Sequence, residues 1–303
     1  MERAAAIKRV LWVVLGLNLA VAVGKLVVGV LAGSLAMVAD GFHSLLDGSS
    51  NLIGLVGIQL AARPPDLDHH YGHQKYEAFA ALGIALLLGI TAVGVVRAGI
   101  ERLLDGARPE PTVAGVGVML ATMIVNAAVT RYEARAGRRL RSQVLLADAA
   151  HTRSDLLVSL SVLAGLGAVW LGWYWVDAAV AFVIAALILW ISYGILKRVS
   201  GELTDTAQLS PEEIAAEVLA VPGVRSSSNI RSRGTPPYLF IDLEIQLPPE
   251  LSLHAAHEVA HRVRDRLMGV YEAADVVVHV EPDTPGRAAA GPGAAAAAGT
   301  GRP

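Results

Sequence analysis

Residues 39–47 (ADGFHSLLD) and residues 147–155 (ADAAHTRSD) share one pattern, Ala-Asp-x-x-His-x-x-x-Asp. Each copy stands in a long apolar run, where water should be scarce. A charged side chain at the centre of a bilayer costs about 2.5–3.5 kcal/mol on insertion scales. Two copies of the same costly spacing therefore indicate a shared function for the two stretches.

Residues four apart lie on one face of an α-helix, so His43 and Asp47 should project together from one helix, and His151 and Asp155 from another. If the two helices are neighbours, two imidazoles and two carboxylates converge. Nitrogen and oxygen ligands in a four-coordinate arrangement suit Zn²⁺. Because two ionised Asp residues neutralise the ion's charge, the spacing predicts a metal site between these helices.

Asp40 and Asp148 lie about one helical turn before the two histidines, on the same faces. Each can accept a hydrogen bond from an imidazole and so fix the orientation of that ligand. Alternatively, each is an outer ligand on the path by which the metal enters. Arg153 points away from both ligands of its own helix, and its charge is expected to reach toward the cytoplasmic surface.

The overall composition indicates a membrane protein. Apolar residues make up 54% of the chain and charged residues 17%, against about 25% charged in soluble domains, and the mean hydropathy is +0.50. The net charge of −2 gives no global field that favours nucleic acid. The absence of cysteine excludes disulfides and thiolate metal sites.

Six apolar segments are each long enough for a membrane helix. They lie near residues 10–31, 34–61, 76–103, 112–133, 144–171 and 175–197. The first follows a basic stretch and continues past about 20 residues without a cleavage site, so we expect a membrane helix and not a removable signal. Lys and Arg collect in the loops on one side, which predicts a multi-pass protein of the cell's inner membrane with both termini in the cytoplasm.

The sequence beyond residue 204 is typical of a soluble domain. Ser210, Pro211 and Glu213 have the pattern of a helix start with a capping box. Polar and apolar residues alternate over residues 238–247, as in a strand with one solvated face. With a preceding strand, a second helix and a final strand, the order αββαβ predicts a small α+β, ferredoxin-like domain.

We therefore expect three parts. Residues 1–204 form a six-helix, all-α transmembrane domain. Residues 205–283 form the cytoplasmic αββαβ domain. Residues 284–303 form a tail of Ala, Gly and Pro that is expected to be disordered.

These features resemble the cation diffusion facilitator transporters, over about residues 8–283. The resemblance rests on six spans, on H-x-x-x-D in the second and fifth of them, and on the αββαβ domain. Members of that family are usually dimers that export divalent transition metals from the cytosol, commonly in exchange for protons. The resemblance implies a homodimer in a lipid membrane, with a divalent cation, most of all Zn²⁺, and protons as partners and no nucleic acid.

The loop RPPDLDHHYGHQKYEA, residues 63–78, is rich in potential metal ligands. Its pattern is similar to the family's D-x-x-H-x-x-G-H, followed by Lys and Glu. The matching residues are Asp66, His69, Gly72, His73, Lys75 and Glu77. The resemblance implies a loop metal site on Asp66, His69 and His73, with Asp68 and His70 as local alternatives.

The resemblance has two further implications. Lys75 and Asp205 stand where the family forms an interlock between its membrane and cytoplasmic domains. Cytoplasmic domains of the family often bind metal between two copies, and the positions that match here are Ser228, Glu244, His257, His279 and Glu281. Because relatives can carry His where this chain has Ser228 and Glu244, we expect a structural or regulatory Zn²⁺ site carried mainly by His257, His279 and Glu281.

Other functions fit the sequence less well. The same transporter could carry Fe²⁺, Co²⁺, Ni²⁺, Cd²⁺ or Mn²⁺, although two imidazoles argue against Mn²⁺. An intramembrane metal-dependent hydrolase would need H-E-x-x-H or another glutamate base, and no Glu is expected near either H-x-x-x-D pair. A membrane-anchored metal sensor would not need four ionisable ligands within the membrane. We predict a secondary active transporter that works by alternating access and is not an enzyme.

Overall fold

The computed structural model describes residues 2–31, 35–105, 113–170 and 174–283. The chain divides into two compact units, Met1–Ser200 and Gly201–Pro303. The tail predicted to be disordered, residues 284–303, lies outside the described residues. So do the side chains of Asp40 and His43, although the backbone of both is helical.

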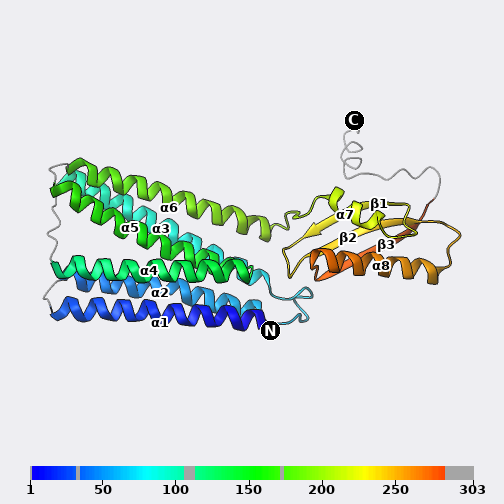
Figure 1. The fold of residues 1–303 in the computed structure, drawn as a ribbon, viewed down its shortest axis with the longest axis horizontal. Coiled ribbons are helices and arrows are strands. Elements are labelled where there is room, and N and C mark those ends of the chain that lie inside the picture. Colours follow the sequence, from blue (N-terminus) through cyan, green and yellow to red (C-terminus); the bar gives the residue numbers. More distant parts are fainter. Residues whose placement is uncertain (1, 32–34, 106–112, 171–173, 284–303) are drawn as a thin grey trace, which may run out of the picture. The chain divides into compact units, whose positions relative to one another are not determined.

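The first unit is a bundle of long helices, which lie side by side in Figure 1. The described helices are α1 (Glu2–Leu31), α2 (Leu35–Ala61), α3 (Lys75–Asp105), α4 (Val113–Arg139), α5 (Gln143–Trp170) and α6 (Tyr174–Leu203). Each has 27 to 31 residues, about 40–46 Å at 1.5 Å per residue, which exceeds the hydrocarbon thickness of a bilayer. The predicted six-helix bundle is confirmed.

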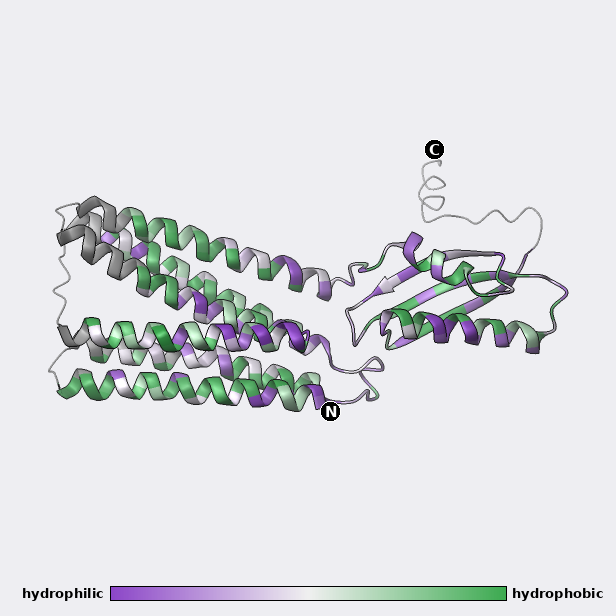
Figure 2. Ribbon diagram, in the orientation of Figure 1, coloured by the Kyte–Doolittle hydropathy of each residue, from purple (hydrophilic) through white to green (hydrophobic). Residues whose placement is uncertain are grey.

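Hydropathy divides these helices into two groups. Within the described residues, α1, α3 and α6 are long and apolar enough to cross a membrane. The other three carry ionisable side chains inside the bundle, among them Asp47, Glu133 and His151. Figure 2 shows apolar colour along most of the bundle, interrupted by hydrophilic turns. These ionisable residues therefore lie on α2, α4 and α5.

Two helices run further than the apolar segments predicted. α4 continues to Arg139 and α6 to Leu203, whereas the apolar runs end at residues 133 and 197. Ala, Arg, Lys and Glu are good helix formers, so a helix need not end where its apolar run ends. As a result Glu133 lies inside α4 and not at its end.

Close backbone approach holds α2 against α3. A Cβ added at Gly57 would lie 2.2 Å from the Cβ of Ala80, so only glycine fits there. Small residues allow this kind of packing between membrane helices. On the other side of α3, the Ser192 hydroxyl of α6 donates to the Ala85 carbonyl across 2.9 Å, which ties α6 to the bundle.

One end of the bundle, here called the loop end, contains the start of α1, the start of α3 and residues 62–74. Arg3 connects three segments at this end by a hydrogen-bonded clasp. Its guanidinium donates to Glu77 Oε2 at 2.9 Å, to the Leu140 carbonyl at 2.8 Å and to the Arg141 carbonyl at 2.9 Å. Since Glu77 is buried, this clasp compensates a charge that would otherwise be costly to bury.

The second unit is a two-layer α/β domain, as predicted. Its elements are α7 (Pro211–Leu219), β1 (Ser226–Arg233), β2 (Phe240–Leu247), α8 (Leu253–Tyr271) and β3 (Asp275–Pro282). The sheet order is β1-β2-β3, with β1 antiparallel and β3 parallel to β2. The expected capping box is present: the Ser210 hydroxyl accepts from the Glu213 amide, and the Glu213 carboxylate accepts from the Ser210 amide.

The two faces of this sheet differ. Ile241, Leu243 and Ile245 of β2 are buried in a core with residues of α7 and α8. The alternate residues point to the opposite face. There the strand register sets Ser228 beside Glu244 and Glu244 beside His279. This second face carries Asp242, Glu244 and Gln246 of β2.

Candidate metal sites

Asp47 of α2 and His151 and Asp155 of α5 converge inside the helical unit. One ligand atom from each lies within 4.8 Å of the others. His151 Nε2 lies 4.0 Å from Asp47 Oδ1, too far for a hydrogen bond. Two ligand atoms on one tetrahedral zinc ion, each at about 2.0–2.2 Å, lie about 3.3–3.6 Å apart. The three groups therefore need only a small contraction to hold one cation.

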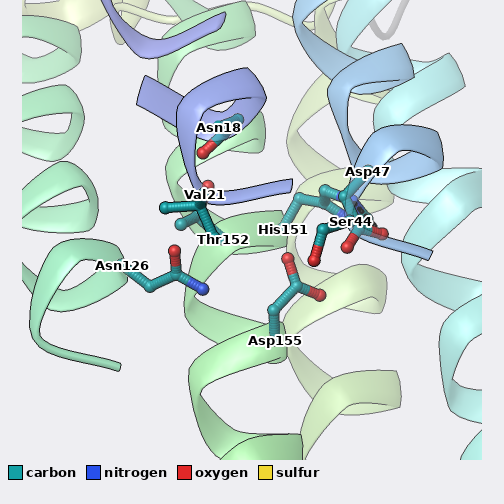
Figure 3. Close-up of a pocket in the computed structure, with 8 residues that line it drawn as sticks. All are labelled: Asn18, Val21, Ser44, Asp47, Asn126, His151, Thr152 and Asp155. Atoms are coloured by element: carbon teal, nitrogen blue, oxygen red, sulfur yellow. Dashed lines mark ion pairs between the residues drawn. The ribbon is translucent and has the colours of Figure 1, made fainter. Parts of the chain in front are cut away.

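His151 is prepared to act as a ligand. The residue is 4% exposed, and neither ring nitrogen has a hydrogen-bond partner among the described residues. A buried imidazole without a partner is unfavourable. A cation bound to one ring nitrogen would remove this penalty. Figure 3 shows Asp47, Ser44 and Asp155 gathered about one small space with His151.

His43 stays a predicted fourth ligand. Its side chain lies outside the described residues, as does that of Asp40. Both belong to α2, and His43 precedes Asp47 by four residues, which places the two on one helix face.

Two cavities meet at the carboxylates. The smaller one, of about 20 Å³, has room for one or two water-sized particles. Its lining comprises Asn18, Val21, Ser44, Asp47, Asn126, His151, Thr152 and Asp155. A larger cavity of about 430 Å³ also touches Asp47 and Asp155, and it extends along residues 90–98 of α3 and Val158 of α5. These positions lie beyond the carboxylates as counted from the loop end, so the site opens away from that end.

Asp148 has a different partner from the one expected. It is fully buried, and its Oδ2 accepts a hydrogen bond from the Asn51 amide and not from His151. Asn51 in turn accepts from Asn18 across 3.0 Å. A polar chain thus joins α1, α2 and α5 on the loop-end side of the three ligands.

The sequence predicted no Glu near an H-x-x-x-D pair. In the folded chain this prediction is wrong, because Glu133 lies close to the pair of α5. Glu133 of α4 is fully buried, and Asp148 and Thr152 of α5 are its polar neighbours. Neighbours across two helices cannot be read from local spacing. The only signal in the sequence was an acidic residue at the edge of the apolar run 112–133. Asn18 and Asn51, amides in apolar runs, were likewise missed.

The loop residues Asp66, His69 and His73 form a second cluster, within 4.8 Å of one another. Asp66 Oδ1 lies 3.3 Å from His69 Nδ1, and Asp66 Oδ2 lies 3.2 Å from His73 Nε2. Gly72 has φ +86°, a left-handed conformation that favours glycine. This turn sets His73 against Asp66 at the start of α3.

Two local features prepare the loop cluster for a cation. His73 Nδ1 lies 3.2 Å from the Pro64 carbonyl; donation to this oxygen puts the proton on Nδ1 and leaves Nε2 available as a ligand. The backbone amide of His69 donates to Asp66, which holds the pKa of that carboxyl below its usual range. Asp66 therefore stays ionised in weak acid.

We expect the loop site to lose metal because its histidines protonate. The Asp66 pKa is lowered, so this ligand keeps its charge as the pH falls. The imidazoles must be neutral to bind, so bound zinc should be lost as the pH falls. The measurement is zinc per chain after dialysis at graded pH, in an Asp47→Asn/Asp155→Asn background that silences the other cluster.

His69→Ala should lower the bound zinc by one ion per chain at neutral pH. His70→Ala is the matched control, because His70 is exposed and belongs to neither described cluster. An equal loss with His70→Ala would assign the site to the alternative ligands. Zinc that stays bound below about pH 4 would contradict imidazole ligation.

The predicted ligands of the cytoplasmic domain are not gathered within one chain. His279 Nε2 lies 3.8 Å from Glu281 Oε1 on β3. Glu244 faces the same side of the sheet, where Ser228 and Asn229 donate to its carboxylate at 3.3 and 2.8 Å. His257 instead lies with His261 on α8, in a cavity shared with Val276 and Val278 of the opposite face.

The predicted interlock would pair Lys75 of the first unit with Asp205 of the second. Lys75 is the first residue of α3, and Asp205 follows α6 in a left-handed conformation with φ 55°. Their pairing stays a prediction.

Two family models match this chain. Residues 11–204 match the cation efflux transmembrane domain, and residues 208–283 match the cytoplasmic domain of cation efflux proteins. A solved structure of MamM-CTD covers 24% of this chain and 89% of its own length, with 24% identity and a TM-score of 0.23.

Three relatives align along most of the chain. An uncharacterised transporter of Methanocaldococcus jannaschii is 32% identical over 87% of this chain and 94% of its own. The cation-efflux pump FieF of Klebsiella pneumoniae is 30% identical over 83% of this chain and 85% of its own. The manganese efflux protein MneS of Bacillus subtilis is 27% identical over 85% and 89%. The chain therefore belongs to the cation efflux family and is a membrane transporter of divalent metal cations, not an enzyme.

Proposed function

We propose that the protein exports Zn²⁺ from the cytosol in exchange for protons, as a homodimer in the inner membrane with both termini in the cytoplasm. The observation that carries the proposal is the convergence of Asp47, His151 and Asp155 inside the helical unit. His43 would complete a four-coordinate set of two nitrogens and two oxygens. Two ionised Asp would neutralise the cation within the low-dielectric bundle.

The cavities suggest the direction of release. In the described conformation the larger cavity reaches Asp47 and Asp155 from the end opposite the loop, while the chain Asn18–Asn51–Asp148 lies toward the loop end. If the loop end faces the cytoplasm, this conformation is open for release to the outside. Uptake would require the bundle to open at the loop end, which is alternating access.

Protons would assist release at the ligands themselves. Metal binding requires a neutral imidazole and ionised carboxylates. Protons that enter the larger cavity from a more acidic outside compete with the cation for these groups. The loop cluster, and a cytoplasmic site completed by a second chain at Glu244, His279 and Glu281, would bind Zn²⁺ as a structural or regulatory ion.

The second candidate is the same mechanism with another cargo: Fe²⁺, Co²⁺, Cd²⁺ or Mn²⁺. The name of MneS, a manganese efflux protein, favours Mn²⁺, whereas a site with two imidazoles disfavours it. The test is the initial rate of uptake of each cation into proteoliposomes. We expect Zn²⁺ and Cd²⁺ to be carried faster than Mn²⁺. A preference for Mn²⁺ would contradict zinc as the cargo.

Selectivity gives a sharper prediction at His43. His43→Asp replaces a nitrogen ligand with an oxygen and adds a negative charge, so the ranking should shift toward Mn²⁺ and other ions that prefer oxygen. The measurement is the ratio of Mn²⁺ to Zn²⁺ uptake rates. His254→Asp, an exposed substitution on α8, is the control. An unchanged ratio would show that His43 is not a ligand.

A further inference from the structure

Two acidic residues beside the metal ligands are buried without adequate partners. Glu133 of α4 and Asp148 of α5 are both 0% exposed. Both carboxylate oxygens of Glu133, and Oδ1 of Asp148, have no hydrogen-bond partner among the described residues. Yet Asp148 and Thr152 are the polar groups that act on Glu133. The two carboxyl groups therefore lie close together in the buried interior, without a hydrogen bond between them.

Nothing nearby compensates two negative charges. On the same helices Arg131, Arg135 and Arg153 are exposed. On α1, Arg3 bonds Glu77, and Lys8 donates to Gln59. No ion pair to Glu133 or Asp148 occurs within the described residues. The other titratable groups that line the adjoining space are Asp47, His151 and Asp155; ionised Asp47 and Asp155 add to the repulsion, and a neutral His151 does not offset it.

Such a pair holds a proton. Two adjacent carboxylates cannot both ionise in a low-dielectric interior, so one of them keeps a proton or the two share it. Burial of an unpaired ionised carboxylate is too costly to be the alternative. Asp148 accepts from Asn51, whereas neither oxygen of Glu133 has a hydrogen-bond partner among the described residues, so we assign the proton to Glu133.

The pair lies on the closed side of the metal ligands. Asp148 precedes Asp155 by seven residues, about 10 Å along the helix axis toward the loop end. Thr152 connects the two places: it lines the small cavity with His151 and Asp155, and it neighbours Glu133. Opening of the loop end for cation uptake would separate the chain Asn18–Asn51–Asp148 and admit water to the pair.

We propose that Glu133 and Asp148 form a proton-carrying site, separate from the metal ligands, that couples proton entry to cation export. With the loop end closed, a proton from the release side reaches Glu133 past Thr152 and forms an O–H bond there. When the loop end opens, water enters, this O–H bond breaks, and the proton leaves to water on the loop side. One proton thus returns for each exported cation, in addition to those taken by the ligands.

This inference rests on the proposed cation–proton exchange, and one assay separates the two. Proteoliposomes that contain a metal-sensitive and a pH-sensitive dye report cation and proton flux together. Glu133→Gln keeps the shape of the side chain but cannot release a proton. We expect the proton-to-cation ratio to fall by one, while exchange of labelled for unlabelled Zn²⁺ at equal concentrations continues.

Two further variants serve as controls for Glu133→Gln. Glu133→Asp retains a carboxyl and should restore the wild-type ratio. Glu101→Gln, the same substitution at an exposed carboxylate of α3 that pairs with Arg97, should leave the ratio unchanged. An unaltered ratio in a transporting Glu133→Gln variant would overturn the proposal.

A Glu133→Gln variant that shows no net cation flux also tests the proposal. If Glu133→Gln still exchanges labelled Zn²⁺, loss of net flux reflects loss of proton coupling and supports the proposal. If exchange and zinc binding are lost together, Glu133 belongs to the cation path and the proposal is wrong. If the wild-type protein itself moves no cation, it is the proposed function that fails.

Discussion

Asp155→Asn should abolish cation transport and leave a folded protein. The substitution keeps the size of the side chain, but the site loses one of the two carboxylates that neutralise the ion. Loss of groups that merely support metal ligands costs 10–100-fold in affinity or activity, so loss of a ligand should cost more than about 100-fold. Uptake of Zn²⁺ by proteoliposomes measures the effect. Asp47→Asn should behave in the same way.

The control for Asp155→Asn is Asp265→Asn, the same change at an exposed position of α8. It should transport at the wild-type rate. Asp155→Asn should elute from size-exclusion chromatography as the wild-type protein does, which separates loss of a ligand from misfolding. Flux close to the wild-type rate in Asp155→Asn would remove this residue from the transport site.

Arg3→Ala should cause the largest loss of stability at the loop end. It leaves the buried Glu77 carboxylate unpaired and removes a donor from the carbonyls of Leu140 and Arg141. Removal of one partner of a buried ion pair costs about 3 kcal/mol or more. Thermal unfolding of the detergent-purified protein should show a clear fall in Tm.

A double-mutant cycle assigns this loss to the pair. Arg3→Ala/Glu77→Ala should be less destabilised than the sum of the single variants, because no unpaired charge stays buried. Arg9→Ala, at an exposed position of the same helix, should change Tm little. Additive effects of Arg3→Ala and Glu77→Ala would show that the two side chains stabilise the fold independently.

Local periodicity was sufficient to predict the helices and which residues share a face. The four-residue spacing of His151 and Asp155 placed both on one side of α5, and its repetition in α2 indicated that the two helices meet. The αββαβ domain was predictable for a similar reason, since its strands alternate polar and apolar residues and Ser210 and Glu213 mark a helix start.

Contacts between helices were not predictable from spacing. Glu133 meets Asp148 only because α4 packs against α5 and continues past its apolar run. Asn51 bonds Asp148 because α2 packs against α5, at a separation of 97 positions along the chain. In the cytoplasmic domain, the family resemblance grouped His257 with His279, yet the sheet separates them: one lies with the covered face and the other on the polar face.

The most direct test of the account is accumulation of Zn²⁺ by wild-type proteoliposomes against its own gradient, driven by an imposed pH difference. With the lumen acidic and the loop end facing outward, Zn²⁺ should rise inside above the external concentration, and reversal of the pH difference should drive it out. Zn²⁺ that only equilibrates, whichever side is acidic, would contradict cation–proton exchange through this site.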